Sequence, residues 1–406
     1  MAELNETPGG NRIRIAFFGL RNAGTSTLVN AFTGQPIAIV SEVAGTTTDP
    51  VSKAMEILPL GPCLVTDTAG LDDVGELGRQ RVEKTLQVLA TTDIAVWVSD
   101  GHEADAASDE RQAFLDECRR RNVTVIDYRR GESVDGLTAK IAAVKLADSV
   151  PGLLDGLVRR GDRVVCVCPI DESAPKGRLI LPQVQVIREC LDLGIPATVC
   201  QPGELADCLD FVSHDLRGRI LVVTDSQAFA TVGQTIQQSS NQPSRQVGTP
   251  AIKQSNNQTI KQFFSLTSFS ILFARQKGDV TAYVEGLRRL AELKDGDRVL
   301  VAEGCTHHRQ CNDIGTVKIP KALAKLTGRK LELDFASGSA FADAESVRRY
   351  ALVVQCGGCM LTRREVLRRI AVAKAAGVPV VNYGMLLAKA AGVPVESCVG
   401  TESVMV

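Results

Sequence analysis

A short apolar run, a glycine-rich turn and a helical pattern follow one another near the start of the chain. The run occupies residues 13–18, the turn reads GLRNAGTST at residues 19–27, and the helical pattern covers 25–33. Such a turn presents backbone N–H groups and a helix N-terminus to phosphate oxygens. Gly19, Gly24 and Ser26 have the spacing of the motif G-x-x-x-x-G-K-[ST], but Thr25 stands where that motif has lysine. The sequence therefore predicts a phosphate-binding loop that lacks its charged side chain.

Two further motifs follow in the order that a GTPase-type domain requires. DTAG, residues 67–70, comes directly after an apolar run, so Asp67 is expected to hold magnesium through water and Gly70 to offer an N–H to a γ-phosphate. Between the loop and DTAG lies AGTTTD, residues 44–49, a candidate switch whose threonine could close on the metal. The three motifs together predict a GTPase-type nucleotide-binding domain.

The guanine-reading side of such a domain is not recognisable. An N-K-x-D motif is expected after the strand predicted at 123–127, but the chain reads VIDYRRGE there, with Asp127 its only acidic candidate on that strand. The nearest counterpart of an S-A-[KL] loop is LADSVPG. Losing a charged phosphate contact and base recognition together weakens binding by about 10²- to 10⁴-fold. We therefore expect an impaired nucleotide site, with a fully active GTPase as the alternative.

Strand and helix patterns alternate along the whole chain, which predicts an α/β protein with mostly parallel sheets. The first series has strands at 13–18, 54–59, 62–66, 94–99 and 123–127 and helices at 25–33, 77–90 and 109–121. The second has strands at 163–168, 197–200 and 219–224 and a helix at 182–193, and the third has strands at 298–302, 331–334, 351–355 and 378–381. We expect an N-terminal doubly wound sheet in residues 1–160 and two further α/β domains, 161–266 and 267–406.

One segment departs from this alternation. Residues 231–262 contain no acidic and no aromatic residue and are dominated by Gln, Ser, Asn and Thr. A segment of this composition cannot bury enough apolar surface to offset its ordering entropy. It is predicted to be a disordered insertion, followed by a helix that begins near Thr267.

Charge and hydropathy exclude some partners. The formal net charge of the 406 residues is −1, so there is no electrostatic case for nucleic acid or an acidic membrane surface. No apolar run reaches the roughly 18 residues that span a bilayer, and the N-terminus is polar. We expect a cytoplasmic protein with no nucleic-acid or membrane partner.

Cysteine and histidine gather near the end of the chain. The segment EGCTHHRQC holds Cys305, His307, His308 and Cys311, and VVQCGGC holds Cys356 and Cys359. Both segments follow predicted strands, so they should meet at the carboxyl edge of one sheet. Three cysteines with one other or vacant position suit an iron–sulfur cluster with an exchangeable iron, or zinc. Most other cysteines lie in apolar runs and are expected to be buried hydrophobes.

The N-terminal motifs resemble the tRNA-modification branch of the translation-factor-like GTPases. In that branch an asparagine of the phosphate loop, matched by Asn22, helps to bind potassium, and a GTTxD switch, matched by Thr46 and Thr47, supplies further potassium and magnesium ligands. The resemblance implies GTP with Mg²⁺ and K⁺, and Ser26 and Thr47 as magnesium ligands. The predicted nucleotide-binding residues are Gly19, Asn22, Ala23, Gly24, Thr25, Ser26, Thr27, Thr46, Thr47, Asp67 and Gly70.

The whole chain resembles the HydF family, the GTPase scaffolds that mature [FeFe]-hydrogenase. The strings that carry the resemblance include PIDESAPKGRLILPQVQVIREC, TDSQAF, LTSFSILFARQKGD, THHRQCNDIGTVKIP and GVPVVNYGM. The family pattern C-x-H…[H]-C-x-x-C is matched by Cys305, His307, Cys356 and Cys359, except that Gln355 stands where many members have histidine.

The resemblance implies a GTPase domain, a dimerisation domain and a cluster-binding domain. It also implies a homodimer and a [4Fe–4S] cluster on three cysteines with a labile fourth position. On that cluster a di-iron precursor made by two radical-SAM maturation proteins is carried to apo-[FeFe]-hydrogenase, while GTP regulates contact with these partners. A zinc or electron-transfer metalloprotein remains the alternative.

Overall fold

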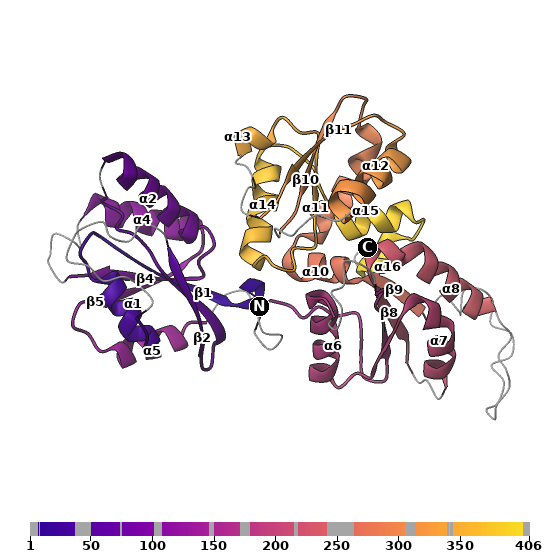
Figure 1. Ribbon diagram of the computed structural model, residues 1–406, viewed down its shortest axis with the longest axis horizontal. Helices are drawn as coiled ribbons and strands as arrows, with labels where there is room; N and C mark the ends of the chain where they lie inside the picture. The colour runs from indigo at the N-terminus through magenta and orange to yellow at the C-terminus, as the bar shows by residue number, and fades with distance from the viewer. Residues whose placement is uncertain are drawn as a thin grey trace. The chain divides into compact units, whose positions relative to one another are not determined.

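A computed structural model gives the fold of the chain (Figure 1). It describes residues 7, 9–36, 50–73, 75–100, 108–145, 150–170, 179–214, 218–241, 264–304, 313–338, 341 and 344–400. The chain divides into two compact units, residues 1–149 and 150–406. Three sheets are present, one in the first unit and two in the second. This confirms the predicted α/β class, whereas the domain boundaries at 160/161 and 266/267 stay predictions.

The first unit contains a five-stranded sheet in the order β2-β3-β1-β4-β5. Only β2 runs antiparallel to its neighbour, β3, and the other pairs are parallel. Its strands are β1 (Ile13–Gly19), β2 (Val51–Ile57), β3 (Gly61–Asp67), β4 (Ile94–Ser99) and β5 (Thr124–Arg129). Its helices are α1 (Thr25–Thr33), α2 (Gly75–Leu89), α4 (Asp109–Arg120) and α5 (Val134–Ala142). Because β1 and β4 are central and buried on both faces, their sequences are nearly continuous apolar runs.

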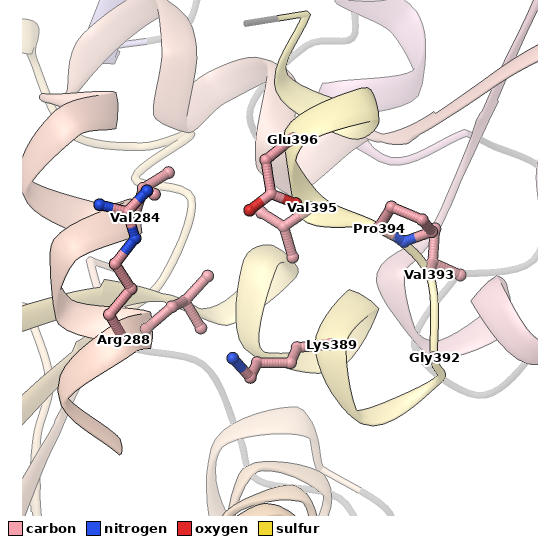
Figure 2. A pocket seen from close by; sticks show the side chains of 9 residues that line it. Val284, Arg288, Lys389, Gly392, Val393, Pro394, Val395 and Glu396 are labelled. Carbon is pink, nitrogen blue, oxygen red and sulfur yellow. The ribbon is translucent and has the colours of Figure 1, made fainter. Parts of the chain in front are cut away.

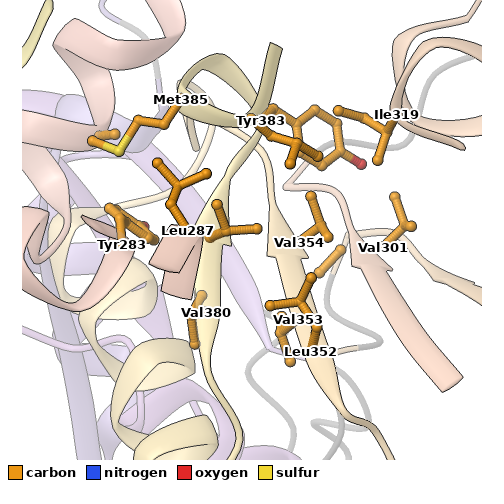
Figure 3. Packing of buried hydrophobic residues seen from close by; sticks show 14 of the residues in the cluster. Tyr283, Leu287, Val301, Ile319, Leu352, Val353, Val354, Val380, Tyr383 and Met385 are labelled. Atoms are coloured by element: carbon orange, nitrogen blue, oxygen red, sulfur yellow. The ribbon is translucent and has the colours of Figure 1, made fainter. Parts of the chain in front are cut away.

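The second unit contains two four-stranded parallel sheets. One has the order β7-β6-β8-β9, from β6 (Arg163–Val167), β7 (Ala197–Cys200), β8 (Ile220–Thr224) and β9 (Phe264–Ser268). The other has the order β11-β10-β12-β13, from β10 (Arg298–Ala302), β11 (Glu332–Ala336), β12 (Leu352–Gln355) and β13 (Val380–Asn382). Figure 3 shows the apolar core that packs on the second of these sheets, including Val301, Val354, Val380 and Tyr383.

Helices cover both sheets of this unit. They are α6 (Leu181–Leu193), α7 (Leu205–Ser213), α8 (Phe229–Asn241), α10 (Phe269–Lys277), α11 (Val280–Arg288), α12 (Ile319–Thr327), α13 (Ala344–Val347), α14 (Arg363–Ala375), α15 (Tyr383–Ala390) and α16 (Val395–Val399). Short 3-10 turns occur at Gly9–Asn11, Pro202–Glu204, Ser226–Ala228 and Arg289–Glu292, and a π-helical turn at Ile314–Lys318. Within the described ranges, no helix is both long and apolar enough to cross a membrane.

Helix α10 belongs to the cores of both sheets. Phe269, Leu272 and Phe273 pack in the core that contains β6 and α6. Ile271 and Ala274, on other faces of the same helix, pack in the core of the β10–β13 sheet. This single helix therefore joins the two halves of the second unit.

Two predictions near the polar segment need correction. Residues 231–241, expected to be disordered, form the greater part of α8, because Val232 and Ile236 lie one turn apart and pack on the core beside β8. Residues 242–262 lie outside the described residues. Residues 264–268 form β9 rather than leading directly into a helix, and α10 starts at Phe269 with Ser268 accepting a hydrogen bond from the N–H of Ile271.

Candidate functional site

The predicted phosphate loop joins β1 to α1 through two left-handed backbone positions. Gly24, at the N-terminus of α1, has φ = 94°, and Asn22 has φ = 62°. Only glycine adopts the first without strain, and asparagine tolerates the second better than most residues. A β-carbon on Gly19 would lie 2.7 Å from the carbonyl oxygen of Val98, so glycine is required where β1 passes β4. The loop therefore has the backbone shape that phosphate binding needs.

Ser26 and Asp67 form a polar pair beneath this loop. The Ser26 hydroxyl donates to Oδ2 of Asp67 at 2.6 Å, and Asp67 is fully buried at the end of β3. Its other oxygen, Oδ1, has no hydrogen-bond partner among the described residues. Burial raises the pKa of Asp67 to about 6, against the lowering effect of hydrogen bonds from Ser26, the backbone of Thr68 and Thr25. A buried carboxylate with an unused oxygen beside a serine hydroxyl fits a magnesium ion.

Asp67 should make the stability of the first unit depend on pH. Because its folded pKa is about 6 and the ordinary value of an aspartate is 3.8, its contribution to stability is full below pH 3.8 and is lost as the pH rises through 6. The free energy of unfolding of wild type relative to Asp67→Asn should fall by at most about 3 kcal/mol over this range. The measurement is denaturant unfolding at each pH, in EDTA to keep metal ions away from Asp67. It is followed by the fluorescence of Trp97, which is the only tryptophan of the chain and lies in β4 of this unit. If the difference in free energy of unfolding between wild type and Asp67→Asn did not change with pH, the raised pKa of Asp67 would be contradicted.

DTAG lies directly against the phosphate loop. A β-carbon on Gly70 would lie 2.8 Å from the backbone nitrogen of Arg21, and the N–H of Leu71 donates to the carbonyl of Gly19 at 3.1 Å. The structure therefore places Gly70 against Arg21 of the loop and Asp67 against Ser26. It adds one residue that the sequence did not single out, because Asp72 accepts a 2.6 Å hydrogen bond from the N–H of Arg21.

The guanine-reading side offers no counterpart of N-K-x-D at the described end of β5. Asp127 lies within β5, its side chain is 65% exposed, and it pairs with Arg111 of α4 at 2.9 Å. The turn after the strand is organised locally, by the Tyr128 hydroxyl that donates to the carbonyl of Glu132. Thr46 and Thr47 of the predicted switch, and most of the LADSVPG segment, lie outside the described residues.

The C-x-x-C motif follows β12 as a tight turn. Glycine is favoured at its two inner positions for different reasons: Gly358 has φ = 69°, and a β-carbon on Gly357 would make a tight contact of 3.2 Å with Cα of Ser270. The N–H of Gly304, after β10, donates to Sγ of Cys356 at 3.1 Å. Cys356 packs on the core of the β10–β13 sheet and Cys359 on the core beside α6. The turn therefore lies where the two halves of the second unit meet.

Burial holds both thiols of the turn in the protonated form when no metal is bound. It raises the pKa of Cys356, against hydrogen bonds from the backbone of Gly358 and Gly304, and it raises the pKa of Cys359 to about 11. Thiols of this kind bind a metal only by releasing protons. Two thiols and their N–H donors suit an iron–sulfur or zinc site.

The remaining predicted ligands are not described. Cys305 and His307 lie outside the described residues, although Cys305 is the next residue after Gly304. Among the residues that the structure describes, no three His, Cys, Asp or Glu side chains are placed to hold a metal. Gln355, at the end of β12, is fully buried, and neither side-chain polar atom has a hydrogen-bond partner in the described part of the chain.

Lys277 is a residue of this site that the sequence reasoning missed. It ends α10, is 1% exposed, and donates to the carbonyls of Gly358, Cys359 and Leu361 at 3.4, 3.2 and 2.7 Å. Burial lowers its pKa to about 8, against the raising effect of Cys359 and Cys356. No local pattern could have revealed it, because more than 80 residues separate the lysine from the turn.

A pocket of about 300 Å³ lies elsewhere in the second unit, between α11, α15 and the start of α16 (Figure 2). Arg288, Lys389 and Glu396 are its charged lining residues. No predicted site residue lines it, so it plays no part in either predicted site.

Three family models match the chain. Residues 14–127 match the 50S ribosome-binding GTPase model, residues 153–241 the hydrogen maturase F dimerization domain, and residues 281–397 the hydrogen maturase F tetramerization domain.

Curated relatives are similar to the N-terminal part of the chain. The tRNA modification GTPase MnmE of Rhizorhabdus wittichii is 34% identical over 152 residues, which cover 36% of this chain and 32% of the relative. GTPase Der of Myxococcus xanthus is 36% identical over 124 residues, which cover 29% of this chain and 27% of the relative. The chain thus spans about a third or less of the length of these relatives.

Proposed function

Because this chain belongs to the hydrogen maturase F (HydF) family, with a GTPase domain followed by HydF dimerization and tetramerization domains, we propose that it is a scaffold and carrier in the maturation of [FeFe]-hydrogenase. In this proposal it holds a [4Fe–4S] cluster and delivers a di-iron precursor to the apo-hydrogenase. The radical-SAM maturation proteins that make the precursor are its other proposed partners.

The proposed cluster ligands are Cys305, Cys356 and Cys359, with His307 beside them. The observation that carries this assignment is the hydrogen bond from Gly304 to Sγ of Cys356, because it joins the residue before Cys305 to the C-x-x-C turn. When bound, a cluster on three thiolates keeps one iron open to exchange, which gives a precursor a point of attachment. The chain's own residues supply the thiolates, the N–H donors to them and the closed surroundings of the turn.

Anaerobic reconstitution of the full chain with iron and sulfide tests this function. We expect about four irons and four sulfides per chain and an EPR signal after reduction that is typical of a [4Fe–4S]⁺ cluster. Metal analysis of the protein as purified distinguishes the cluster from the zinc alternative, because a zinc site would give about one zinc per chain and no EPR signal. That second result would overturn the carrier proposal.

The nucleotide domain is proposed to bind a magnesium–nucleoside triphosphate weakly and to hydrolyse it near the background rate. Asp67 and Ser26 would hold the magnesium, and the backbone N–H groups of residues 22–26 would surround the phosphates. The missing lysine would otherwise meet charge that develops in the transition state, so hydrolysis should suffer more than binding. The potassium ion at Asn22 and the switch threonines Thr46 and Thr47 remain part of this proposal.

Self-association is proposed to use the edge of the β6–β9 sheet. Strand β7 lies at that edge, and β7 and the helices on either side of it in sequence carry five of the exposed large hydrophobic residues in the described parts of the chain: Val184, Leu191, Leu193, Val199 and Phe211. Phe211 of α7 is 76% exposed and Leu191 of α6 is 72% exposed. Exposed apolar groups beside an open strand favour an interface between copies.

The double substitution Leu191→Glu and Phe211→Glu should therefore break the dimer. Buried aromatic and aliphatic anchors are each worth about 2 kcal/mol or more, so the dissociation constant should rise by at least about 30-fold. Sedimentation velocity over a concentration series measures the change. Leu77→Glu, the same kind of change at one 53% exposed position of α2, is the control. An undisturbed dimer in the double variant would place the interface elsewhere.

A further inference from the structure

The last residue of α10, Lys277, is a buried lysine that contacts the C-x-x-C turn. An ammonium group has three N–H donors, and the three carbonyls that Lys277 reaches, those of Gly358, Cys359 and Leu361, match that number. The ring of Phe273, one turn earlier in α10, has its centroid 5.2 Å from the ammonium nitrogen. The backbone of residues 358–361 is therefore fixed to α10 through one side chain.

The position of this lysine needs an electrostatic explanation. A buried ammonium is costly unless a negative charge lies near it. Lys277 donates to the carbonyl of Cys359 and to the neighbouring carbonyls of Gly358 and Leu361, so its ammonium group lies next to the turn that carries the thiols of Cys356 and Cys359. Because both must lose their protons to bind a metal, metal binding is the event that gives Lys277 negative neighbours.

A second residue of α10, Ser270, faces the same turn. Ser270 lies two helical turns before Lys277, and its Oγ is 3.1 Å from where a β-carbon on Gly357 would lie. This oxygen is buried and has no hydrogen-bond partner within the described residues. One face of α10 therefore runs along the turn from Gly357 to Leu361, while other faces of the helix pack in both cores.

We propose that Lys277 is a positioning residue of the metal site: it anchors the C-x-x-C turn to α10 and offsets the charge of the two thiolates when a metal or cluster is bound. The anchoring part stands on the hydrogen bonds alone, and the charge part rests on the proposed function. Through α10, the lysine also makes the geometry of the turn depend on the half of the unit that carries the dimerization domain.

Hydrogen exchange of the metal-free full chain tests the anchor without reference to any cluster. Lys277→Met removes the three donors and keeps most of the side-chain volume, so the amides of residues 356–362 should exchange about tenfold faster. Lys277→Arg keeps a charged donor and should stay within about twofold of wild type. Lys325→Met is the matched control, because Lys325 donates to one carbonyl, that of Ala390, at 2.6 Å on an exposed surface. Unchanged exchange of residues 356–362 in Lys277→Met would overturn the anchor.

Measurements on the protein reconstituted with iron and sulfide test the proposed role of the charge of Lys277. Loss of a residue that holds metal ligands in place, without binding the metal itself, lowers metal affinity by about 10- to 100-fold. A chelator should therefore remove iron from Lys277→Met at least about tenfold faster than from wild type. The cluster's midpoint potential should also become more negative, because reduction adds an electron beside a site that has lost a positive charge. Lys277→Arg should keep the wild-type potential, which a purely structural role would not require.

The outcomes separate this inference from the proposed function. A Lys277→Met protein with wild-type potential and wild-type iron loss would overturn the charge role. If the wild-type chain takes up no iron, the carrier proposal fails, and zinc affinity of the same three proteins then decides the charge role. A variant that does not fold is replaced by Lys277→Gln, whose amide group keeps two N–H donors without the charge, and the same two measurements apply.

Discussion

Replacing Cys356 by serine should abolish cluster binding while the chain stays folded. Cys356 receives an N–H hydrogen bond from Gly304 and packs against the β10–β13 core, so its sulfur is fixed where β10 and β12 end. A serine hydroxyl is a harder and far less acidic donor than a thiol, and it suits iron–sulfur clusters poorly. We expect iron to fall from about four per chain to below about one and the EPR signal of the reduced protein to vanish.

Cys208→Ser is the matched control for this experiment. Cys208 is a partly exposed free cysteine of α7 that packs with the core formed by β6, β8 and α7. It should keep wild-type iron and an unchanged EPR signal. Equal loss of iron from both variants would point to general damage, and retained iron in Cys356→Ser would remove this cysteine from the ligand set.

The order of strands and helices could be predicted from the sequence because the parallel strands are buried on both faces. Such strands appear as short apolar runs, and the runs at 13–18, 94–99 and 298–302 coincide with β1, β4 and β10. Helix α1 has the predicted bounds, Thr25–Thr33, because a left-handed glycine stands at each end, Gly24 and Gly34. Glycine at such positions is visible in sequence.

The errors beside the polar segment have a physical cause too. Composition describes a segment as a whole, whereas α8 packs on the core through two apolar residues, Val232 and Ile236. The many polar residues around them dominate the average composition, so the helix was not predicted. Strand β9 is short, and its pairing with β8 is a contact between residues more than 40 positions apart. Local patterns do not contain that information.

The candidate sites were predictable in part for the same reason. Motif residues close together in sequence, such as Gly24 and Ser26, mark the predicted phosphate loop, and C-x-x-C marks the thiol pair. Asp72 and Lys277 accept from or donate to backbone groups that lie far away in the sequence. A hydrogen bond to a backbone group requires no particular side chain at the partner position, so no residue pattern marks either contact and the structure was needed to find both.

Thr25→Lys should strengthen the binding of nucleotide phosphates to the loop. Thr25 is the first residue of α1, directly after Gly24, and its hydroxyl helps to lower the pKa of buried Asp67. A lysine at this position adds a charged contact to the phosphates worth about 1.5–3 kcal/mol, so Mg–triphosphate should bind about 10- to 150-fold more tightly. Fluorescent GTP and ATP analogues titrated into the full chain measure both affinities.

The same titration tests whether the base is read at all. At the described end of β5 no side chain takes the place of N-K-x-D, and Asp127 is engaged with Arg111. The gain in Thr25→Lys should therefore be similar for GTP and ATP, with the two affinities within about tenfold of each other, since specific polar contacts are what give larger discrimination. Thr33→Lys, at the opposite end of α1, is the control that adds a lysine away from the loop. Potassium-stimulated GTP turnover by the wild-type chain would contradict this reasoning, because the loop would then function without a lysine. A strong preference of the wild-type chain for GTP over ATP would mean that guanine is read by residues outside β5 and its following turn.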